Sequence, residues 1–576
     1  MTRIANDPAD FAHEALDGFV AAHRRWVRSV PGGVVRAGGT APGQVALVIG
    51  GGSGHYPAFS GLVGQGLAHG AAVGNVFASP SARQIHDVAA EADNGAGVLL
   101  AFGNYAGDVL HFGQAAQRLT ADGIPARTLA VTDDISSATA DEHHKRRGIA
   151  GDLPVFKLAA AAAERGATLD EVHATAARAN ERTRSFGVAF TGCTLPGAEQ
   201  PLFTVPEGRM AVGLGIHGEP GIGEQDVPDA KTLAALLVDS LLAELPQVRG
   251  GRAAVLLNGL GSVKYEELFV LYGEVDRLLA AAGVTAVDPE VGELCTSFDM
   301  AGVSLTLTWL DDELAELWQA PADAPAFRKG AVTPTPAHEK TTTRQPVTAD
   351  TPPPADADSR ATATRVLAAL AATRTTVDTH ADDLGRIDAV AGDGDHGIGM
   401  RRGSHAAHAE AERAVAAGAG AGTTLRLAGD AWADEAGGTS GALWGAMLRA
   451  LGDTLGDTGR PTPARVAEGV SAADRAVREL GGAQVGDKTM VDALVPFAAA
   501  LNDAVDDSDD SLGDRLAPAW ATAASAAEDA ARATADLLPR MGRARPHAEK
   551  ALGTPDAGAH SFALITRAVA GVLAAT

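Results

Sequence analysis

Val45-Ala-Leu-Val-Ile-Gly-Gly-Gly-Ser-Gly-His55 joins a short apolar run to a glycine-rich turn. The five apolar residues Val45–Ile49 indicate a buried β-strand, because the run is too short for a typical helix and ends at glycine. The glycines let the backbone turn tightly and approach a ligand closely. Strands that end in such turns are typical of open α/β sheets, which bind ligands at the carboxyl ends of their strands. The stretch therefore predicts an α/β fold.

Apolar runs and helical stretches alternate through the first half of the chain, and this alternation indicates α/β layers. The predicted strands are Val45–Ile49, Gly97–Phe102, Thr128–Thr132, Ala253–Leu257 and Ser304–Thr308. The predicted helices are Pro80–Ala92, Val109–Thr120, Val155–Arg165, Leu169–Ser185 and Ala230–Leu245. A strand-and-turn pattern over Gly187–Leu202 marks a second α/β subdomain, so we divide this half into residues 1–185 and 186–330.

The character of the sequence changes after Ala320. Residues 331–360 are rich in Pro and Thr and have no hydrophobic period, which is typical of an extended linker. Strand signals then almost vanish, and Ala- and Leu-rich stretches predict an all-α bundle or barrel over residues 361–576. Its predicted helices are Arg365–Asp378, Arg402–Ala416, Gly441–Leu455, Pro463–Leu480, Met490–Ala504, Leu516–Leu537 and His560–Leu573.

The composition limits the partners of the protein. The formal net charge of −25 argues against nucleic acid and against an anionic membrane surface, because both attract clustered Lys and Arg. The two cysteines, Cys193 and Cys295, have no zinc-ligand spacing and are too few for a disulfide framework. The N-terminal residues lack the apolar core of a signal peptide, and we find no apolar run of 18 residues. We therefore expect a cytoplasmic protein without a transmembrane helix.

Three glycine-rich loops of the first half each present a side chain suited to catalysis. His55 follows the glycines of the first loop, Asp108 ends the sequence GNYAGD, and His217 lies within GLGIHGEPG. A single histidine is more often a structural hydrogen-bonding group than a catalyst. If the three loops converge, they form a base–nucleophile cluster that can activate a hydroxyl group. The glycine pattern is not GxGxxG, so support for a dinucleotide site is weak.

Three carboxylates crowd together in the second half, because Asp388, Asp393 and Asp395 fall within eight residues. Like charges this close repel, and either proton uptake or a bound cation must relieve the repulsion. Mg²⁺ takes oxygen ligands and commonly bridges carboxylates to nucleotide phosphates. The cluster indicates a metal–phosphate site, with a solvated acidic turn as the alternative, since Asp and Gly are both turn residues.

Other loops of the second half have polar groups that suit phosphate. The N–H groups and hydroxyls of Gly437–Gly441 could hold phosphate at a helix N-terminus, or simply cap the helix. Gly486–Thr489 offers the cation of Lys488 to phosphate, with a capped helix start as the alternative. Asp556 lies in a further late loop, and a Walker A sequence is absent.

Together these motifs resemble the ATP-dependent dihydroxyacetone kinases over nearly the whole chain. The first half carries IANDP, GGGSGH, NYAGD, RRGIAGD, GCTLPG, GIHGEPG, LLNGLG and TSFDMAG, and the second half carries GDGDHG, GGTSGALWG, GDKTMVDAL and PDAGAHS. In that family a ketone-binding domain precedes an all-α nucleotide-binding domain, which matches the order predicted here. Fusion of both parts in one chain resembles the ATP-using branch rather than the branch that draws phosphate from the phosphotransferase system.

The resemblance implies roles for residues of the first half. His217 matches the family histidine that bonds covalently to the substrate carbonyl as a hemiaminal. Only an aldehyde or ketone accepts an imidazole nitrogen in this way, so glycerol should be rejected. Asp108 matches the base that takes the proton from the reacting hydroxyl, and His55 matches its partner that polarises the substrate. Gly52 and Ser53 would line the same pocket.

The resemblance also implies the nucleotide site of the second half. Asp388, Asp393 and Asp395 match the aspartates that hold two Mg²⁺ ions between the phosphates of ATP, where the metals offset charge on the transferring group. The further nucleotide contacts that it implies are His396, Gly438, Thr439, Ser440, Gly441, Gly486, Met490, Arg543, Asp556 and Gly558.

Two positions beside the ketose pocket depart from the family pattern. Tyr56 stands where members that act on dihydroxyacetone usually have Glu, and Gly103 stands where many have Lys. We expect Gly103 to free space and the Tyr56 hydroxyl to meet an extra substrate hydroxyl. The four-carbon ketose erythrulose is therefore as well supported as dihydroxyacetone, and pockets discriminate weakly against an added hydroxyl. The chirality of erythrulose stays open.

These observations lead to one main hypothesis and two alternatives. The main hypothesis is a cytoplasmic, Mg-ATP-dependent kinase that phosphorylates a terminal hydroxyl of erythrulose or dihydroxyacetone. The first alternative is a lyase that forms cyclic FMN from FAD with the helical domain alone. The second is a ketose-sensing regulator without enzymatic activity. By the same resemblance, we expect a homodimer.

Overall fold

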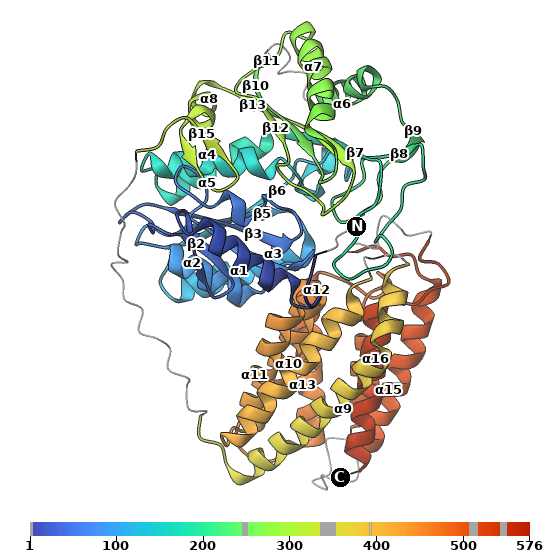
Figure 1. Cartoon of the computed structure of the whole chain (residues 1–576). Helices are drawn as coiled ribbons and strands as arrows, with labels where there is room; N and C mark the ends of the chain where they lie inside the picture. Colours follow the sequence, from blue (N-terminus) through green and yellow to red (C-terminus); the bar gives the residue numbers. More distant parts are fainter. Residues whose placement is uncertain are drawn as a thin grey trace. The chain divides into compact units, whose positions relative to one another are not determined.

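The computed structural model describes residues 4–244, 251–333, 353–390, 392, 394–505, 516–541 and 550–575. The chain divides into two compact units, which we call the α/β unit (Met1–Arg344) and the helical unit (Gln345–Thr576) (Figure 1). Most of the predicted linker lies outside the described residues, as do Asp393 and Arg543.

The first sheet of the α/β unit is mixed, with strand order β1-β2-β4-β3-β5-β6. Its strands are β1 Val27–Val30, β2 Gly33–Arg36, β3 Ala46–Ser53, β4 Gly70–Val76, β5 Val98–Gly103 and β6 Ala126–Val131. Strands β4, β3, β5 and β6 run parallel, whereas β1, β2 and β4 pair antiparallel. The carboxyl ends of β3, β5 and β6 therefore meet at one edge, where sheets of this kind bind ligands.

The second sheet is also mixed, with strand order β11-β10-β13-β7-β8-β9 and with β12 beside β10. Its strands are β7 Thr183–Ala189, β8 Arg209–Val212, β9 Gly223–Asp226, β10 Arg252–Gly259, β11 Thr285–Ala286, β12 Glu290–Gly292 and β13 Gly302–Leu310. A separate hairpin pairs β14 Ala322–Asp323 with β15 Arg328–Lys329. The loops that leave β8 and β12 carry residues of the site described below.

Alternating side chains on the strands create a layered core. Leu47 and Ile49 of β3 pack on one side of the first sheet with α4 and α5, and Ala46 and Val48 pack on the other with α2 and α3. Leu256 of β10 joins the α4–α5 core, so these helices lie between the two sheets (Figure 1). The helices of the unit are α1 Phe11–His23, α2 Ala82–Ala92, α3 Ala106–Ala121, α4 Asp152–Glu164, α5 Leu169–Glu181, α6 Ala230–Glu244, α7 Tyr265–Ala281 and α8 Asp312–Gln319.

The predicted strands and helices of this half all form, with one correction. The helix predicted over Leu169–Ser185 ends at Glu181, because Thr183–Ala189 pairs with β13 as strand β7. Its β-branched and aromatic residues fit a pleated surface better than a helix. Helices α1, α7 and α8 and the shorter strands β1, β2, β4, β8, β9, β11, β12, β14 and β15 were not predicted.

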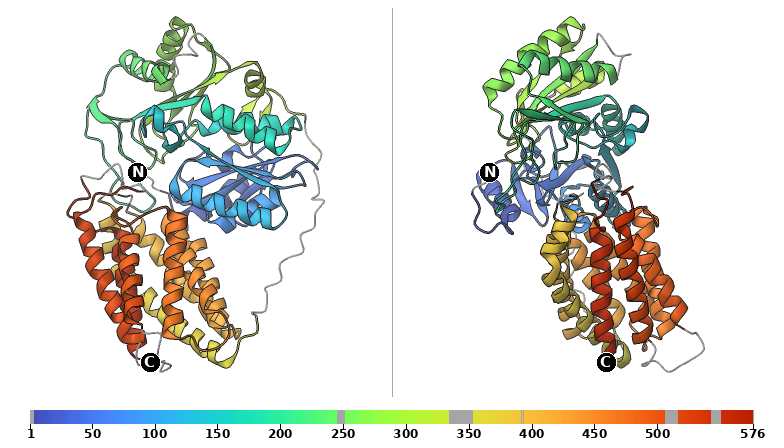
Figure 2. Two further views of the ribbon diagram at one scale, coloured as in Figure 1. Left: turned by 180° about the vertical axis from the view of Figure 1, so that it is seen from behind. Right: turned by 90° about the vertical axis from the view of Figure 1, so that its right-hand side faces the viewer.

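The helical unit is a closed ring of helices. Its helices are α9 Ala357–Asp388, α10 His396–Ala416, α11 Ala421–Ala436, α12 Gly438–Leu455, α13 Pro463–Gly481, α14 Val491–Ala504, α15 Leu516–Ala533 and α16 Ala557–Ala574. Each of these helices contacts the next, and α16 contacts α9 (Figure 2). Successive helices run in opposite directions, so alternate connections gather at the same end, where His396 contacts Ser440 and Ser561.

Comparison with the sequence confirms the all-helical prediction and corrects some details. Helix α9 begins at Ala357, inside the segment predicted as linker, where Asp356 caps it by accepting a hydrogen bond from the N–H of Ser359 (2.8 Å). Helix α11 was not predicted. Helix α16 is, contrary to expectation, long and apolar enough by composition to cross a membrane. It is nevertheless part of the core of the unit, since Phe562 and Ile565 are buried there.

Lys157 of α4 generates a stability prediction. Its side chain is fully buried, and Nζ donates to the carbonyl of Leu317 (3.0 Å). Burial, with a smaller contribution from Lys329, lowers the pKa of Lys157 to about 7. The unfolded chain, with an ordinary lysine pKa near about 10.4, then binds more protons than the folded chain between these values. Stability rises with pH in this window as the cost of burying the charge disappears.

We predict that Lys157→Met raises the melting temperature at pH 7 by about 2–4 °C, the shift expected for about 1 kcal/mol in a domain of this size. The gain should shrink towards pH 10, because fewer unfolded lysines then carry a proton that folding must remove, and it should vanish above about pH 11, where the lysine is neutral in both states. Thermal unfolding of the full chain at several pH values measures it. Lys145→Met, which changes a partly exposed lysine, is the control. A gain that is independent of pH, or a loss at pH 7, would contradict the prediction.

Candidate active site

Two buried histidines are in direct contact at the ligand-binding edge of the first sheet. His55 follows β3, His217 lies in the loop between β8 and β9, and their Nε2 atoms are 2.9 Å apart. Nδ1 of His55 lies 2.8 Å from the carbonyl oxygen of Thr296 and must donate to it. The structure thus brings together two histidines that are far apart in the sequence.

Aromatic rings wall this histidine pair. The ring of Phe77 stacks on His55, with centroids 4.9 Å apart, and meets His217 edge-on at 5.1 Å. Tyr105 meets His217 edge-on at 4.7 Å. Phe77 has a positive φ of 53°, a strained conformation for an aromatic residue that is found mainly at functional sites. The rings exclude water from the imidazoles and strengthen the polar contacts between them.

A buried ionic network continues from His217. Nδ1 of His217 lies 3.0 Å from Oε1 of Glu219, and its backbone N–H donates to Oε2 at 3.0 Å. Nη1 of Arg147 is 3.8 Å from Oε2 of Glu219. Nε and Nη2 of Arg147 both donate to Oδ2 of Asp134, at 3.0 and 2.8 Å. Asp134, Arg147 and Glu219 were not predicted at the site, although Glu219 lies within the motif GIHGEPG and Arg147 within RRGIAGD.

Asp108 belongs to the same edge of the sheet. It is buried in the first turn of α3, three residues after Tyr105, whose ring packs on His217. Asp152 at the start of α4 lies close enough to Asp108 for the two carboxyl groups to interact electrostatically. Burial raises the pKa of Asp152 well above its usual value, and the charges of Asp133 and Asp108 raise it further. Asp108 is therefore one member of a buried carboxyl cluster beside the histidine pair.

The four predicted substrate residues have different positions. A Cβ on Gly52 would lie 2.8 Å from the backbone of Phe77, so glycine is required there. Ser53 donates through Oγ to the carbonyl of Gly74 (2.7 Å). The half-exposed ring of Tyr56 packs edge-on against Phe19, with centroids 6.1 Å apart. The carbonyl of Tyr56 accepts a hydrogen bond from Oγ1 of Thr296 (2.8 Å), whose own carbonyl faces Nδ1 of His55.

Gly103 does not free space, contrary to expectation. A Cβ at this position would lie 3.2 Å from the ring of Tyr105, 3.3 Å from the carbonyl of Gly148 and 3.4 Å from Oδ2 of Asp152. These neighbours occupy the volume that a longer residue would need. The carboxyl of Asp152, rather than an open pocket, takes the place beside Gly103.

In the helical unit, His396 joins three loops at one end of the ring. Its Nε2 lies 3.0 Å from Oγ of Ser561, and its Nδ1 lies 3.3 Å from Oγ of Ser440. Its backbone N–H donates to Oδ2 of Asp388 (3.4 Å). The structure therefore brings together Asp388, His396 and Ser440, which were predicted at the nucleotide site, and adds Ser561 of α16, which was not predicted.

Carboxyl groups gather at the same end. Burial and the charge of Asp388 raise the pKa of Asp395 to about 7. Burial raises the pKa of Asp556 to about 7, and the charges of Asp388 and Asp492 act in the same direction. Oxygen donors that repel one another suit a hard divalent cation. No three His, Cys, Asp or Glu side chains converge as metal ligands within the described ranges, which leave out the predicted ligand Asp393.

The other predicted nucleotide residues lie in the neighbouring loops. Gly438, Thr439, Ser440 and Gly441 form the first turn of α12. The N–H of Gly486 donates to Asp492 (2.6 Å), and the Cα of Gly558 faces Met490. Arg543 is outside the described residues. The ammonium group of Lys488 binds backbone carbonyls instead of pointing towards a phosphate site. Its Nζ donates to the carbonyls of Leu537, Ala551 and Thr554 at 3.1, 2.7 and 2.8 Å.

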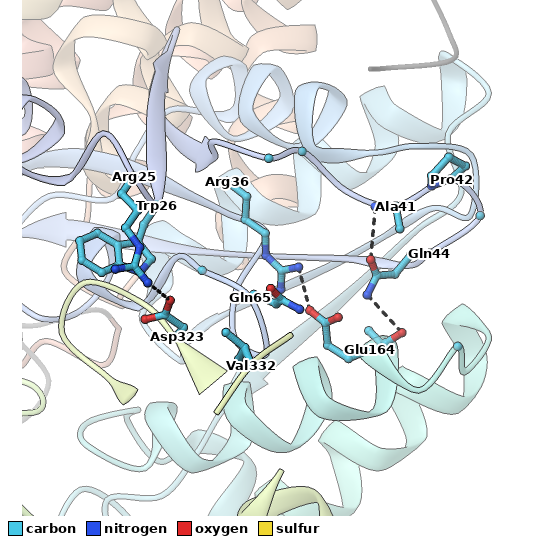
Figure 3. Close-up of a pocket in the computed structure, with 16 residues that line it drawn as sticks. Arg25, Trp26, Arg36, Ala41, Pro42, Gln44, Gln65, Glu164, Asp323 and Val332 are labelled. Carbon is cyan, nitrogen blue, oxygen red and sulfur yellow. Dashed lines mark hydrogen bonds and ion pairs between the residues drawn. The ribbon is translucent and has the colours of Figure 1, made fainter. Parts of the chain in front are cut away.

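A cavity of about 560 Å³ lies elsewhere in the α/β unit (Figure 3). Its described lining includes none of the predicted site residues. The charged groups in its wall pair with each other, Arg36 with Glu164 at 2.7 Å and Arg25 with Asp323 at 3.0 Å. These pairs leave little uncompensated charge for a ligand.

Both units match known domain families. Residues 17–326 match the Dak1 domain and residues 390–571 match the DAK2 domain. The L-erythrulose kinase of Pectobacterium atrosepticum is 61% identical over 100% of this chain and 97% of its own. The chain belongs to the single-chain dihydroxyacetone kinase family. The predicted family resemblance is confirmed.

Further relatives extend this family assignment. The D-erythrulose kinase of Mycolicibacterium smegmatis is 56% identical to this chain, and the match covers 99% of this chain and 98% of the relative. The crystal structure of the dihydroxyacetone kinase of C. freundii in complex with AMP-PNP and Mg²⁺ is 29% identical, with a TM-score of 0.52 and 99% of both chains covered. The α/β half followed by an all-helical half is thus the family architecture.

The close packing at Gly52 generates a prediction for this family member. Gly52→Ala places a methyl group 2.8 Å from the backbone of Phe77 and should displace the ring that stacks on His55. We expect overpacking to cost about 1–3 kcal/mol and ketose-dependent ADP release to fall. Thermal unfolding and a coupled assay measure the two effects.

The matched control is Gly18→Ala in α1, where a Cβ meets no atom within 4 Å. This change should stabilise the helix by about 0.5–1 kcal/mol and leave activity alone. Equal stability and activity of the two variants would show that the contact at Gly52 is unimportant.

Proposed function

We propose that this protein is an ATP-dependent kinase that phosphorylates a terminal hydroxyl of the four-carbon ketose erythrulose and also accepts dihydroxyacetone. The full-length similarity to erythrulose kinases supports the choice of substrate, and the buried His55–His217 pair supports a site for a carbonyl compound. The ketose-binding domain would span residues 1–330, and the ATP-binding domain would begin with α9 at Ala357 and run to residue 576, with the linker between them ending before that helix. A cytoplasmic homodimer completes the proposal.

His217 would hold the ketose covalently. Glu219 occupies Nδ1, so Nε2 is the nitrogen that attacks the carbonyl carbon. The Nε2–C bond forms, the π electrons of the carbonyl move to its oxygen, and that oxygen takes a proton to give a hemiaminal. Attack needs an unprotonated nitrogen and a carbonyl acceptor, and a polyol such as glycerol has no carbonyl. Anchoring fixes the terminal hydroxyl in one orientation, which lowers the entropic part of the barrier.

Asp108 would act as the base of the transfer step. Its carboxylate accepts the proton of the ketose hydroxyl as the hydroxyl oxygen bonds to the γ-phosphorus of ATP, and the bond to the leaving ADP oxygen breaks. His55 would donate a hydrogen bond to the substrate oxygen and polarise the carbonyl. Gly52, Ser53 and Tyr56 would line this pocket, and Gly103 would border it through its backbone, with the carboxyl of Asp152 beside it.

The helical unit would supply the nucleotide site. Asp388, Asp393 and Asp395 would hold two Mg²⁺ ions, which offset the charge of the phosphates when bound. The crowding of Asp388 and Asp395 fits such a group, because carboxylates that repel each other become compensated. The nucleotide itself would contact His396, Gly438, Thr439, Ser440, Gly441, Gly486, Met490, Arg543, Asp556 and Gly558.

The direct test of the function is ADP release by the full chain with Mg-ATP and one acceptor at a time. The panel is L-erythrulose, D-erythrulose, dihydroxyacetone, D-glyceraldehyde and glycerol. We expect the highest kcat/KM with one enantiomer of erythrulose, lower values with dihydroxyacetone, and none with glycerol. Turnover of glycerol, or of no ketose in the panel, would contradict the proposal.

Replacing His217 with Ala tests the covalent anchor. The variant should lose ketose binding, so that KM for erythrulose rises by about tenfold or more, as expected when a dominant contact is removed. Binding of ATP should stay as in the natural protein. An unchanged ketose KM would remove His217 from the mechanism. FAD cleavage, the alternative activity, should survive this substitution because it would use the helical domain alone.

Replacing Asp108 with Asn tests the base. The amide keeps the shape of the side chain but cannot accept the hydroxyl proton, so kcat should fall by about 100-fold or more, the size of a general-base effect. ATP binding and ketose binding should persist, as isothermal calorimetry can measure. A near-normal kcat would assign the base to another residue.

A further inference from the structure

The hydrogen bonds around the two histidines fix how many protons they carry. Nδ1 of His55 faces the carbonyl of Thr296, so it must hold a proton. Nδ1 of His217 faces the carboxylate of Glu219, so it must hold one as well. Two neutral imidazoles of this kind would bring bare Nε2 lone pairs together at 2.9 Å. One further proton must bridge them, and the pair carries a single positive charge.

The charges of the network then balance. Asp134 and Glu219 contribute two negative charges, and Arg147 and the histidine pair contribute two positive charges. A buried network without net charge is the arrangement that burial tolerates, because an uncompensated buried charge costs several kcal/mol. Burial lowers the pKa of Arg147, but the nearby charges of Asp134 and Glu219 outweigh burial and raise it above its usual value.

Within this network, Glu219 decides which nitrogen of His217 meets a substrate. Its carboxylate engages both the imidazole Nδ1 and the backbone N–H of His217. When the bridging proton lies on His55, Nε2 of His217 is unprotonated and can attack the carbonyl carbon, while His55 can give that proton to the carbonyl oxygen. If Glu219 moved, the imidazole could hold its proton on Nε2 instead and lose its nucleophilic nitrogen.

Arg147 keeps Glu219 in place. The guanidinium is tied to Asp134 through two nitrogens and reaches Glu219 with a third, Nη1. The backbone makes room for this contact at Gly215, where a Cβ would lie 2.2 Å from Oε2 of Glu219 and 2.6 Å from Nη1 of Arg147. Side chains and backbone are thus both arranged around the Arg147–Glu219 contact.

We propose that Arg147 is a positioning residue of the ketose site: anchored by Asp134, it holds the Glu219 carboxylate on Nδ1 of His217 and so presents Nε2 of His217 to the ketose carbonyl. The inference rests on the proposed role of His217. It adds a charged relay of Asp134, Arg147 and Glu219 behind the nucleophile. Carboxylate partners orient catalytic histidines by the same principle.

Arg147→Lys tests the proposal in the full-length enzyme, because lysine keeps the charge but cannot bond Asp134 and Glu219 at the same time. We expect kcat/KM for erythrulose to fall by about 10- to 100-fold, the usual cost of losing a charged orienting contact. KM for ATP should not change. The matched control is Arg146→Lys, which alters the neighbouring buried arginine that pairs with Glu244 through two nitrogens. It should leave the ketose KM unchanged.

Gly215→Ala tests the same contact without removing any charge. The added methyl group displaces Glu219 from Arg147, so kcat/KM for erythrulose should fall as it does in Arg147→Lys. The double variant should lose no more kcat/KM than either single variant, because both substitutions break the same Arg147–Glu219 contact. Nitrogen-15 NMR of the histidine rings supplies a readout that a purely structural role would not move. It should show His217 protonated on Nδ1 in the natural protein and mixed between its nitrogens in both variants.

Two outcomes separate this inference from the proposed function. If His217→Ala loses ketose binding while Arg147→Lys and Gly215→Ala keep natural ketose kinetics and the Nδ1–H form, the positioning role of Arg147 is wrong and the function stands. If His217→Ala itself binds ketose normally, the covalent anchor fails, and the role of Arg147 fails with it.

Discussion

The 2.9 Å contact between Nε2 of His55 and Nε2 of His217 is the interaction on which the α/β half depends. Two imidazoles at this distance need a shared proton, and a buried positive charge needs a carboxylate nearby. Glu219 meets that need and in turn requires Arg147 and Asp134. One hydrogen bond between two histidines thus requires three further charged residues, and together they form a buried network without net charge. The residues of this network stabilise the fold more as a set than they would singly, because the low dielectric of the interior strengthens the attraction of paired charges and raises the cost of an unpaired one.

The fold supplies the positions for this network. Parallel strands β3 and β5 end at one edge and deliver His55 and the turn that leads to Asp108. Loops of the second sheet deliver His217 and the carbonyl of Thr296. Helices α4 and α5, packed between the two sheets, fix how these edges meet. In the helical unit the fold likewise positions the site, because antiparallel helices in a ring bring His396, Ser440 and Ser561 to one end.

Sequence patterns predicted the parts of the molecule that depend on local chemistry. The apolar run at Val45–Ile49 and the glycines after it indicated β3 and the loop that presents His55. The helix expected over Leu169–Ser185 was too long, because pairing with β13 overrides helix propensity after Glu181. The packing of Asp152 against Gly103 was beyond prediction, since it is a contact between distant segments. Lys488, whose charge suggested phosphate, instead satisfies three backbone carbonyls.

Glu219, Arg147 and Asp134 show why the rest could not be predicted. Arg147 and Glu219 stand beside glycines, a pattern common in exposed loops, and Asp134 lies in a polar stretch after a strand. Only their burial beside His217 gives these three residues a role. The most direct measurement of the central claim is carbon-13 NMR of erythrulose labelled at its carbonyl carbon, mixed with nitrogen-15-labelled full-length protein without nucleotide. The account predicts that the ketone signal gives way to a tetrahedral carbon coupled to one nitrogen, and that His217→Ala abolishes this species. A spectrum with only free ketone and its hydrate would contradict it.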